Sequence, residues 1–190
     1  MEALSSLVRE HRFITRLVTA LEGYASRVRQ GADVEPRHVR EFARALREYV
    51  DELHREKEEH VLLPFLVRHG FDWDAPPLAQ VCDEHSHERE LIAALDHAGA
   101  RLERWSDEER RHVTGLVGAL CGLQREHHHT ENDQLFPAVR HRLDAAAQRE
   151  LYAELERFDQ RPAHVERREA ARNLGEELIA RYAVLDSTGP

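Results

Sequence analysis

The sequence is poor in lysine and cysteine. Lys57 is the only lysine among 27 basic residues, and 36 acidic residues outnumber them, so the formal charge is −9 with histidine neutral. Such a surface argues against nucleic acid or an anionic membrane as the main partner. The two cysteines, Cys82 and Cys121, lack the C-x-x-C spacing of a zinc or redox motif. This argues against a disulfide framework.

Long apolar runs are missing as well. Nowhere do about 18 apolar residues follow one another, as a membrane-spanning helix would need. The first residues, MEALSSLVREHRF, contain no basic segment followed by an apolar one. We therefore expect a soluble, cytoplasmic protein. A nucleophile triad, a glycine-rich phosphate loop and strand alternation are also absent, so those enzyme and fold classes have no support.

Helical periodicity fills most of the chain. Apolar residues recur at three- and four-residue steps, and turns rich in glycine and proline separate the segments. Ser106 and Glu109 predict a capping box at the start of the last long segment. The expected helices lie at residues 3–30, 37–69, 78–105 and from 107 to beyond 131. This pattern predicts an all-α fold, an up-down-up-down four-helix bundle with additional C-terminal helices.

The additional helices follow residue 142. Residues 143–158 form an amphipathic stretch with Asp144 as its expected N-cap, and residues 163–184 have the pattern of a last helix. We therefore expect the bundle at residues 1–141 and a helical extension at residues 142–190.

One pair of residues occurs twice. His54 and Glu58 are four residues apart, and His127 and Glu131 repeat this spacing 73 residues later. The surrounding segments, HREKEEHVLLP and HHHTENDQLFP, align without a gap. A spacing of four places both side chains on one face of a helix, about one turn apart, so each pair can reach a common centre.

Two further histidines complete the pattern. His11 lies 43 residues before His54, and His85 lies 42 residues before His127. All of these side chains lie on the apolar stripe of their helix, where an unpaired imidazole or carboxylate would cost several kcal/mol. Metal coordination would compensate the whole set at once. The predicted metal ligands are His11, His54, Glu58, His85, His127 and Glu131.

A proline follows each pair at the same offset. Pro64 and Pro137 each remove a hydrogen bond to the carbonyl four residues earlier. Two interpretations stay open: either the helix bends just beyond the glutamate, or the proline ends it.

These motifs resemble the hemerythrin-like family, also called HHE cation-binding domains, and the C-terminal helices resemble extensions found in its bacterial single-domain members. The resemblance covers roughly residues 4–140. It rests on EHRFI around His11, DEHSHERE around His85, and the two H-x3-E pairs with the Leu-Pro or Phe-Pro that follows. The resemblance implies a non-haem diiron centre inside a four-helix bundle, with an oxo or hydroxo bridge.

The resemblance also implies a role for each ligand. Glu58 and Glu131 would bridge the two irons. The terminal ligands would be His11 and His54 on one iron, and His85 and His127 on the other. The same donor set would also hold zinc or manganese, because affinity order alone does not select the metal.

One position departs from the oxygen-carrying members. They have a second histidine one turn after the third-helix ligand, where this chain has Arg89, and arginine does not ligate iron. Each iron then keeps open or solvent-filled positions, which argues against simple oxygen carriage. Arg89 could act as a catalytic residue that holds a negatively charged peroxide group, or it could pair with a carboxylate such as Glu88.

Three functions are consistent with the resemblance. The first is a diiron protein with catalase-like activity that acts on peroxide or oxygen and protects against oxidative stress. The second is a module that binds or senses oxygen, nitric oxide or iron. The third and least favoured is an oxidase of a small organic substrate. The expected partner in each case is a small molecule, and the oligomeric state stays open.

Overall fold

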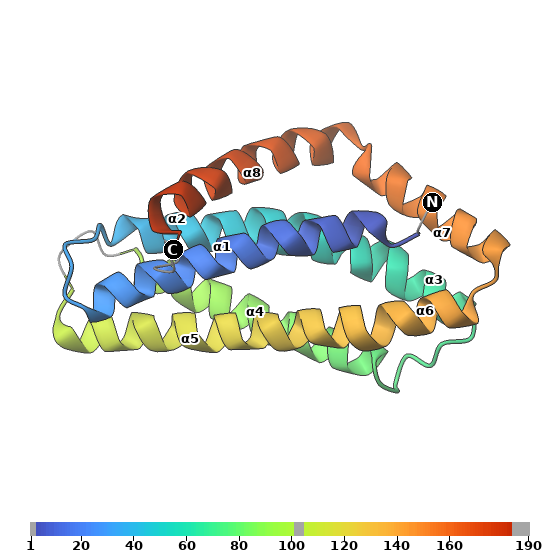
Figure 1. Cartoon of the computed structure of the whole chain (residues 1–190), viewed down its shortest axis with the longest axis horizontal. Coiled ribbons are helices and arrows are strands. Elements are labelled where there is room, and N and C mark those ends of the chain that lie inside the picture. Colours follow the sequence, from blue (N-terminus) through green and yellow to red (C-terminus); the bar gives the residue numbers. More distant parts are fainter. Residues whose placement is uncertain (1–2, 101–104, 184–190) are drawn as a thin grey trace, which may run out of the picture.

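The computed structural model describes residues 3–100 and 105–183, and every regular element in these ranges is helical. Four long rods form a bundle (Figure 1). The first rod is α1 (Ser5–Arg29) and the third is α4 (Leu78–Ala98). The second and fourth rods each contain several consecutive elements. The predicted all-α bundle is therefore confirmed.

The second and fourth rods change their helix type near the repeated pairs. The second consists of α2 (Arg37–Leu46), the π-helical segments η1 (Arg47–Arg55) and η2 (Glu58–Leu62), and α3 (Leu63–Arg68). The fourth consists of α5 (Asp107–His129), the π-helical segment η3 (Thr130–Leu135), and α6 (Phe136–Arg142). Short π-helical segments are frequent at functional sites.

Both prolines lie at the start of the α-helix that follows a π-helical segment. Pro64 is in the first turn of α3 and Pro137 is in the first turn of α6. In neither rod does the proline end the helix, because the chain remains helical up to Arg68 and Arg142. The first turn tolerates proline because its N–H groups have no partner one turn earlier in the same α-helix.

Two boundaries test the expected helix ends. The capping box at Ser106 and Glu109 is present, so the start of α5 is confirmed. The third helix is shorter than expected, because α4 ends at Ala98 rather than near residue 105. At the next residue the chain passes close to α2: a Cβ on Gly99 would lie 2.8 Å from the backbone nitrogen of Arg40. Residues 101–104 lie outside the described ranges.

The C-terminal helices lie across the second rod. α7 (Ala145–Asp159) begins at the expected N-cap Asp144 and packs on η2, and α8 (Pro162–Tyr182) packs on α1, α2 and η1 (Figure 1). Close approach to α1 depends on Gly175, because a Cβ there would lie 2.6 Å from Cζ of Phe13. The division at residue 141 stays a prediction.

Apolar packing occurs in two separate clusters. One joins residues 13–28 of α1 to α2, η1, α4, α5 and α8. The other joins residues 3–7 to α3, α6 and α7. The predicted metal ligands occupy the level between these clusters, so apolar side chains close the centre of the bundle at both ends. In the described part of the chain, no helix is both long and apolar enough to cross a membrane.

Candidate metal centre

All four rods contribute to one buried layer of polar side chains. His11 comes from α1, His85 from α4 and His127 from α5. His54 comes from η1, and the two glutamates come from η2 and η3. None of the six predicted ligands exposes more than 4% of its surface. The structure thus brings the whole predicted set together.

The donor atoms form two overlapping groups. Within each group, one nitrogen or oxygen atom from each of the four residues lies within 4.8 Å of the others. One group contains His11, His54, Glu58 and Glu131, and the other contains Glu58, His85, His127 and Glu131. The two groups share both glutamates and differ only in their histidines.

Each glutamate faces one histidine of each group. For Glu58, Oε1 is 3.4 Å from Nε2 of His54 and Oε2 is 3.3 Å from Nε2 of His85. For Glu131, Oε2 is 3.0 Å from Nε2 of His11 and 3.5 Å from Nε2 of His127. This arrangement suits two cations that share both carboxylates.

The facing atoms have no hydrogen-bond partner among the described residues. They are the Nε2 atoms of the four histidines and all four carboxylate oxygens of the two glutamates. An unpaired buried polar atom costs about 1–3 kcal/mol, and the contacts between the histidines and the glutamates compensate the eight converging atoms only in part. Cations compensate all of them, and nitrogen and carboxylate donors suit iron, zinc and manganese.

Each histidine makes a hydrogen bond through Nδ1, the ring nitrogen that points away from the centre. The partners of Nδ1 are Glu10 for His54 at 2.8 Å, Glu59 for His85 at 2.8 Å, Glu84 for His127 at 3.0 Å, and Asn132 for His11 at 3.2 Å. When Nδ1–H donates to the partner oxygen, Nε2 keeps its lone pair toward the centre. Carboxylate or carbonyl partners of this kind orient metal-bound imidazoles and raise their basicity.

These four partners were not among the predicted site residues, although the repeat contains a signal for them. Glu10 and Glu84 each precede a predicted ligand histidine, and Glu59 and Asn132 each follow a predicted ligand glutamate. Neighbours on a helix point in different directions, so each partner reaches a histidine on another rod. Residues at equivalent positions in the repeat therefore orient equivalent histidines.

On one side of the centre, which we call the Glu58 side, cations support the carboxylate partners of His54 and His85. Lys57 Nζ donates to Glu10 at 2.5 Å, and Arg89 Nη2 donates to Glu59 at 2.8 Å. Burial alone would raise both carboxyl pKa values. Lys57 and His54 outweigh burial at Glu10 and lower its pKa to about 2. Hydrogen bonds from His85 and Arg89 lower the pKa of Glu59 to about 2.

The opposite side, which we call the Glu131 side, comprises Glu131, its two histidines and their partners. On this side, no cation of the described part of the chain contacts the residues that hydrogen-bond to the two histidines. Glu84 accepts hydrogen bonds from Gln80 at 2.8 Å and Thr130 at 3.2 Å, and Asn132 is itself uncharged. Burial would raise the pKa of Glu84, but hydrogen bonds from His127 and Gln80 lower it. At the centre, burial would likewise raise the pKa of Glu131, but His127 and His11 lower it.

Arg89 donates hydrogen bonds to two carboxylates. Nε donates to Asp51 at 2.5 Å, and Nη2 donates to Glu59. These contacts place Arg89 behind His85, as a residue that positions Glu59. Glu88, the carboxylate that the sequence offered as its partner, instead pairs with Arg55, and both of these side chains are fully buried.

His128, which is not among the predicted ligands, lies next to the centre. Its ring stacks on that of His11 at a centroid distance of 4.1 Å, and its Nε2 has no partner among the described residues. Burial and the nearby His11 lower the pKa of His128 to about 2, so the ring is neutral.

Comparison with known protein families shows to which family the chain is related. A family model described as the hemerythrin HHE cation-binding domain matches residues 2–95. The chain belongs to this hemerythrin family. The search of curated proteins found no match, and neither did the search of solved structures.

The matched region contains the first half of the site. His11, His54, Glu58 and His85 fall within residues 2–95 of this hemerythrin-like chain, whereas His127 and Glu131 lie beyond them. The second half of the site therefore rests on the internal repeat and on the buried geometry. Together these observations give a cation-binding domain with buried histidine and glutamate clusters that can hold metal.

Proposed function

We propose that this protein holds two iron ions at the described centre and uses the pair in redox chemistry with peroxide or dioxygen. The observation that carries the proposal is the pair of donor groups that share Glu58 and Glu131. Two separate cations fit such groups better than one, because each group has its own two histidines. Bound iron would supply the one-electron oxidation and reduction steps.

The protein's own residues would hold and orient the metals. Glu58 and Glu131 would join the two ions, and the histidines would bind with Nε2 while their Nδ1 partners fix the rings. Four protein donors in each group leave coordination positions free for a small ligand. Zinc and manganese suit the same donors, so iron rests on the family relationship.

Burial favours small reactants. The six ligands are almost inaccessible to solvent, and apolar clusters cover the layer at both ends. Peroxide, dioxygen and nitric oxide are small enough for such a centre, whereas a larger organic substrate would need the helices to move apart. The neutral Nε2 of His128 offers one hydrogen bond to a small molecule beside His11.

Activity can be tested by loading the protein with Fe²⁺ without oxygen and then adding oxygen, peroxide or nitric oxide while the visible spectrum is recorded. We expect irreversible oxidation by oxygen, and oxygen release from peroxide faster than with free iron. Glu58→Ala and Glu131→Ala should lose this activity together with bound iron. His60→Ala is the matched control, because His60 is exposed on the same π-helical segment as Glu58.

The alternative is a module that only binds or senses a gas. A stable oxygenated form that releases oxygen under vacuum, without oxygen release from peroxide, would contradict the redox proposal and support this alternative.

A further inference from the structure

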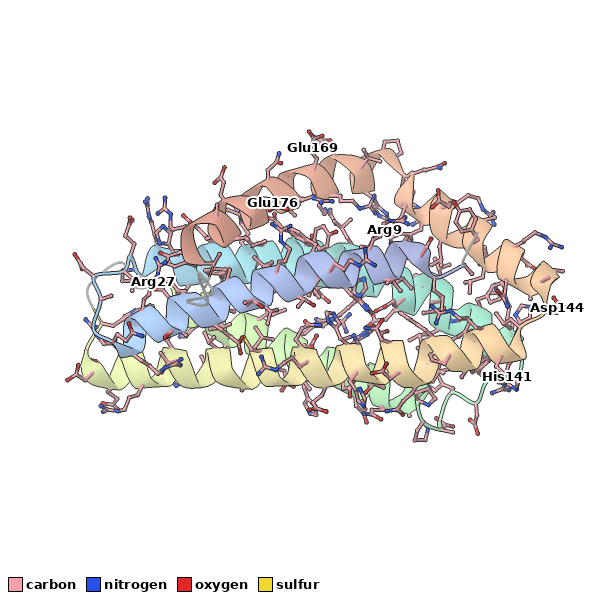
Figure 2. The ribbon with its side chains drawn as sticks, viewed as in Figure 1. Arg9, Arg27, His141, Asp144, Glu169 and Glu176 are labelled. Atoms are coloured by element: carbon pink, nitrogen blue, oxygen red, sulfur yellow. The ribbon has the colours of Figure 1, made fainter. Side chains whose placement is uncertain are left out.

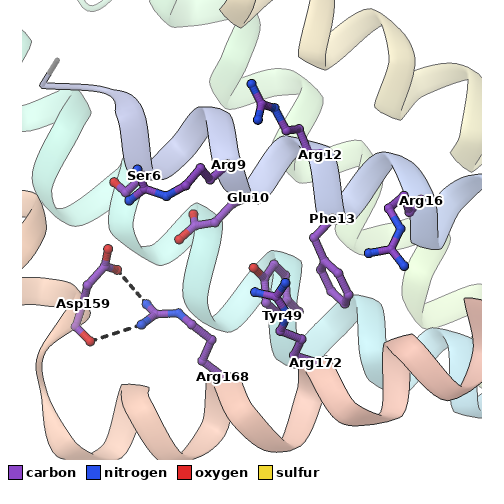
Figure 3. A pocket seen from close by; sticks show the side chains of 10 residues that line it. All are labelled: Ser6, Arg9, Glu10, Arg12, Phe13, Arg16, Tyr49, Asp159, Arg168 and Arg172. Carbon is purple, nitrogen blue, oxygen red and sulfur yellow. Dashed lines mark hydrogen bonds and ion pairs between the residues drawn. The ribbon is translucent and has the colours of Figure 1, made fainter.

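A second polar site lies on the outer side of α1. A cavity of about 370 Å³ opens between α1, η1 and the C-terminal helices (Figure 3). Its charged lining is dominated by arginine, from both α1 and α8. The five arginines are Arg9, Arg12, Arg16, Arg168 and Arg172. In a chain with a formal charge of −9, such a concentration of positive charge is a local exception.

Several of these guanidinium groups have no anionic partner. Arg9, labelled in Figure 2, and Arg12 make no hydrogen bond or ion pair with the described residues. Arg172 makes none either: its guanidinium lies 5.4 Å from the centroid of the Phe13 ring and acts on Glu176 only at longer range. By contrast, Glu176 holds Arg16 through two hydrogen bonds of 2.8 and 2.6 Å. The cavity therefore keeps positive charge that the protein does not neutralise.

The carboxylates in the lining are already satisfied. Glu10 binds Lys57 and His54. Asp159 binds Lys57 and also Arg168, and Figure 3 shows the contact with Arg168. Their charges are thus compensated within the protein, and the unpaired arginines remain available.

Two buried residues also turn a hydroxyl group toward the cavity. Ser6 is 6% exposed and Tyr49 is 3% exposed, and neither hydroxyl makes a hydrogen bond with the described residues. Burial raises the pKa of Tyr49, so its hydroxyl keeps its proton and can donate. Tyr49 and Arg172 both line this cavity (Figure 3). Both hydroxyls reach solvent in the cavity, where they can donate to a ligand.

We infer that this cavity binds a small molecule with at least two negative charges on phosphate or carboxylate oxygens. Guanidinium groups match the geometry of both oxyanions and bind them through paired hydrogen bonds. Charge of one sign within a walled cavity also concentrates ligands of the opposite sign. The volume lies in the usual range for small-molecule sites. The inference is independent of the proposed metal chemistry.

Calorimetric titration of the whole chain with pyrophosphate, citrate and acetate tests the inference. We expect one pyrophosphate or citrate per chain, with the tighter of the two identifying the phosphate or carboxylate class, and no measurable binding of acetate. Arg172→Gln and Arg9→Gln should each weaken binding about tenfold, because each removes a charge-assisted contact. Tyr49→Phe should weaken it by a smaller factor.

Arg149→Gln is the matched control, since Arg149 is exposed, lies outside the cavity lining and makes no hydrogen bond or ion pair with the described residues. Thermal unfolding followed by circular dichroism shows whether each variant is folded at the titration temperature. The inference fails if neither polyanion saturates the wild-type protein. It also fails if folded Arg172→Gln and Arg9→Gln bind as the wild type does, or if Arg149→Gln weakens binding as much as they do.

Discussion

The Glu58 side and the Glu131 side of the centre have the same geometry and different electrostatics. Behind the Glu58 side, both histidine partners are carboxylates in contact with a cation, Lys57 or Arg89. Behind the Glu131 side, one partner is the neutral Asn132 and the other, Glu84, is supported by neutral groups. Each donor group contains one histidine from each side. The asymmetry therefore distinguishes Glu58 from Glu131. It does not distinguish the two donor groups, because each group has one histidine of either kind.

This difference indicates where the site gains rigidity and where it tolerates change. A buried ion pair fixes geometry, but removal of one partner leaves an uncompensated charge. Neutral hydrogen bonds contribute less and cost less when they are lost. We expect substitutions behind the Glu58 side to have the larger effects.

The largest effect should come from Lys57→Met. Lys57 is fully buried and pairs with Glu10 and Asp159, so the variant leaves two carboxylates without their common cation. We expect the free energy of unfolding to fall by about 3–5 kcal/mol. On the neutral side, Gln80→Leu should cost about 1 kcal/mol. Urea unfolding of the metal-free proteins measures both, and equal losses would contradict the comparison.

The second effect is a dependence of the free energy of unfolding on pH. The pKa of Glu10 is lowered to about 2 in the folded protein, so its stabilising contribution is present above the ordinary carboxyl pKa and is lost as pH falls toward 2. That contribution is about 3 kcal/mol at neutral pH. Metal-free Glu10→Gln should therefore be less stable than the wild type at pH 7.

The gap between the two proteins should close on acidification. Urea midpoints at several values between pH 7 and pH 2 measure this trend. A gap that stays constant with pH would show that the Glu10 charge does not contribute.

The third effect concerns metal affinity. Glu59→Gln takes the carboxylate from His85 and should weaken metal binding about 10- to 100-fold. Asn132→Asp gives His11 a carboxylate partner and should strengthen binding, because both partners on the Glu131 side would then be carboxylates. Competition with a chelator for Zn²⁺ measures both without redox change. Glu56→Gln, on the same rod, is the control and should bind as the wild type does.

The smallest effect should come from Arg89→Gln. Arg89 is 37% exposed in its side chain, so solvent screens its contact with Glu59. We expect zinc affinity to fall only a few-fold in the same competition assay. A loss as large as that of Glu59→Gln would instead indicate that Arg89 acts at the metal itself.

Much of the fold follows from the sequence because its signals are local. Helical periodicity, the capping box at Ser106 and the N-cap Asp144 each depend on residues within a few positions of one another. The four-residue spacing also brings together the six candidate ligands, since a helix fixes which side chains share a face. The end of α4 was wrong, because a close approach between helices near Gly99 is not visible in the periodicity.

Other features depend on contacts between distant segments. His54 receives its partner from α1, 44 positions earlier in the chain, and Lys57 reaches Asp159 over 102 positions. Spacing along one helix cannot specify such pairs. The arginine cavity likewise forms only because α8 folds back onto α1, where Gly175 allows close packing.

The central claim is that one chain holds two iron ions that share Glu58 and Glu131. Mössbauer spectroscopy of the protein loaded with ⁵⁷Fe and then oxidised, combined with metal analysis, tests it most directly. We predict two irons per chain whose spins are coupled through the shared carboxylates, and loss of both irons in Glu58→Ala and in Glu131→Ala. One iron per chain, or two irons without magnetic coupling, would contradict the claim.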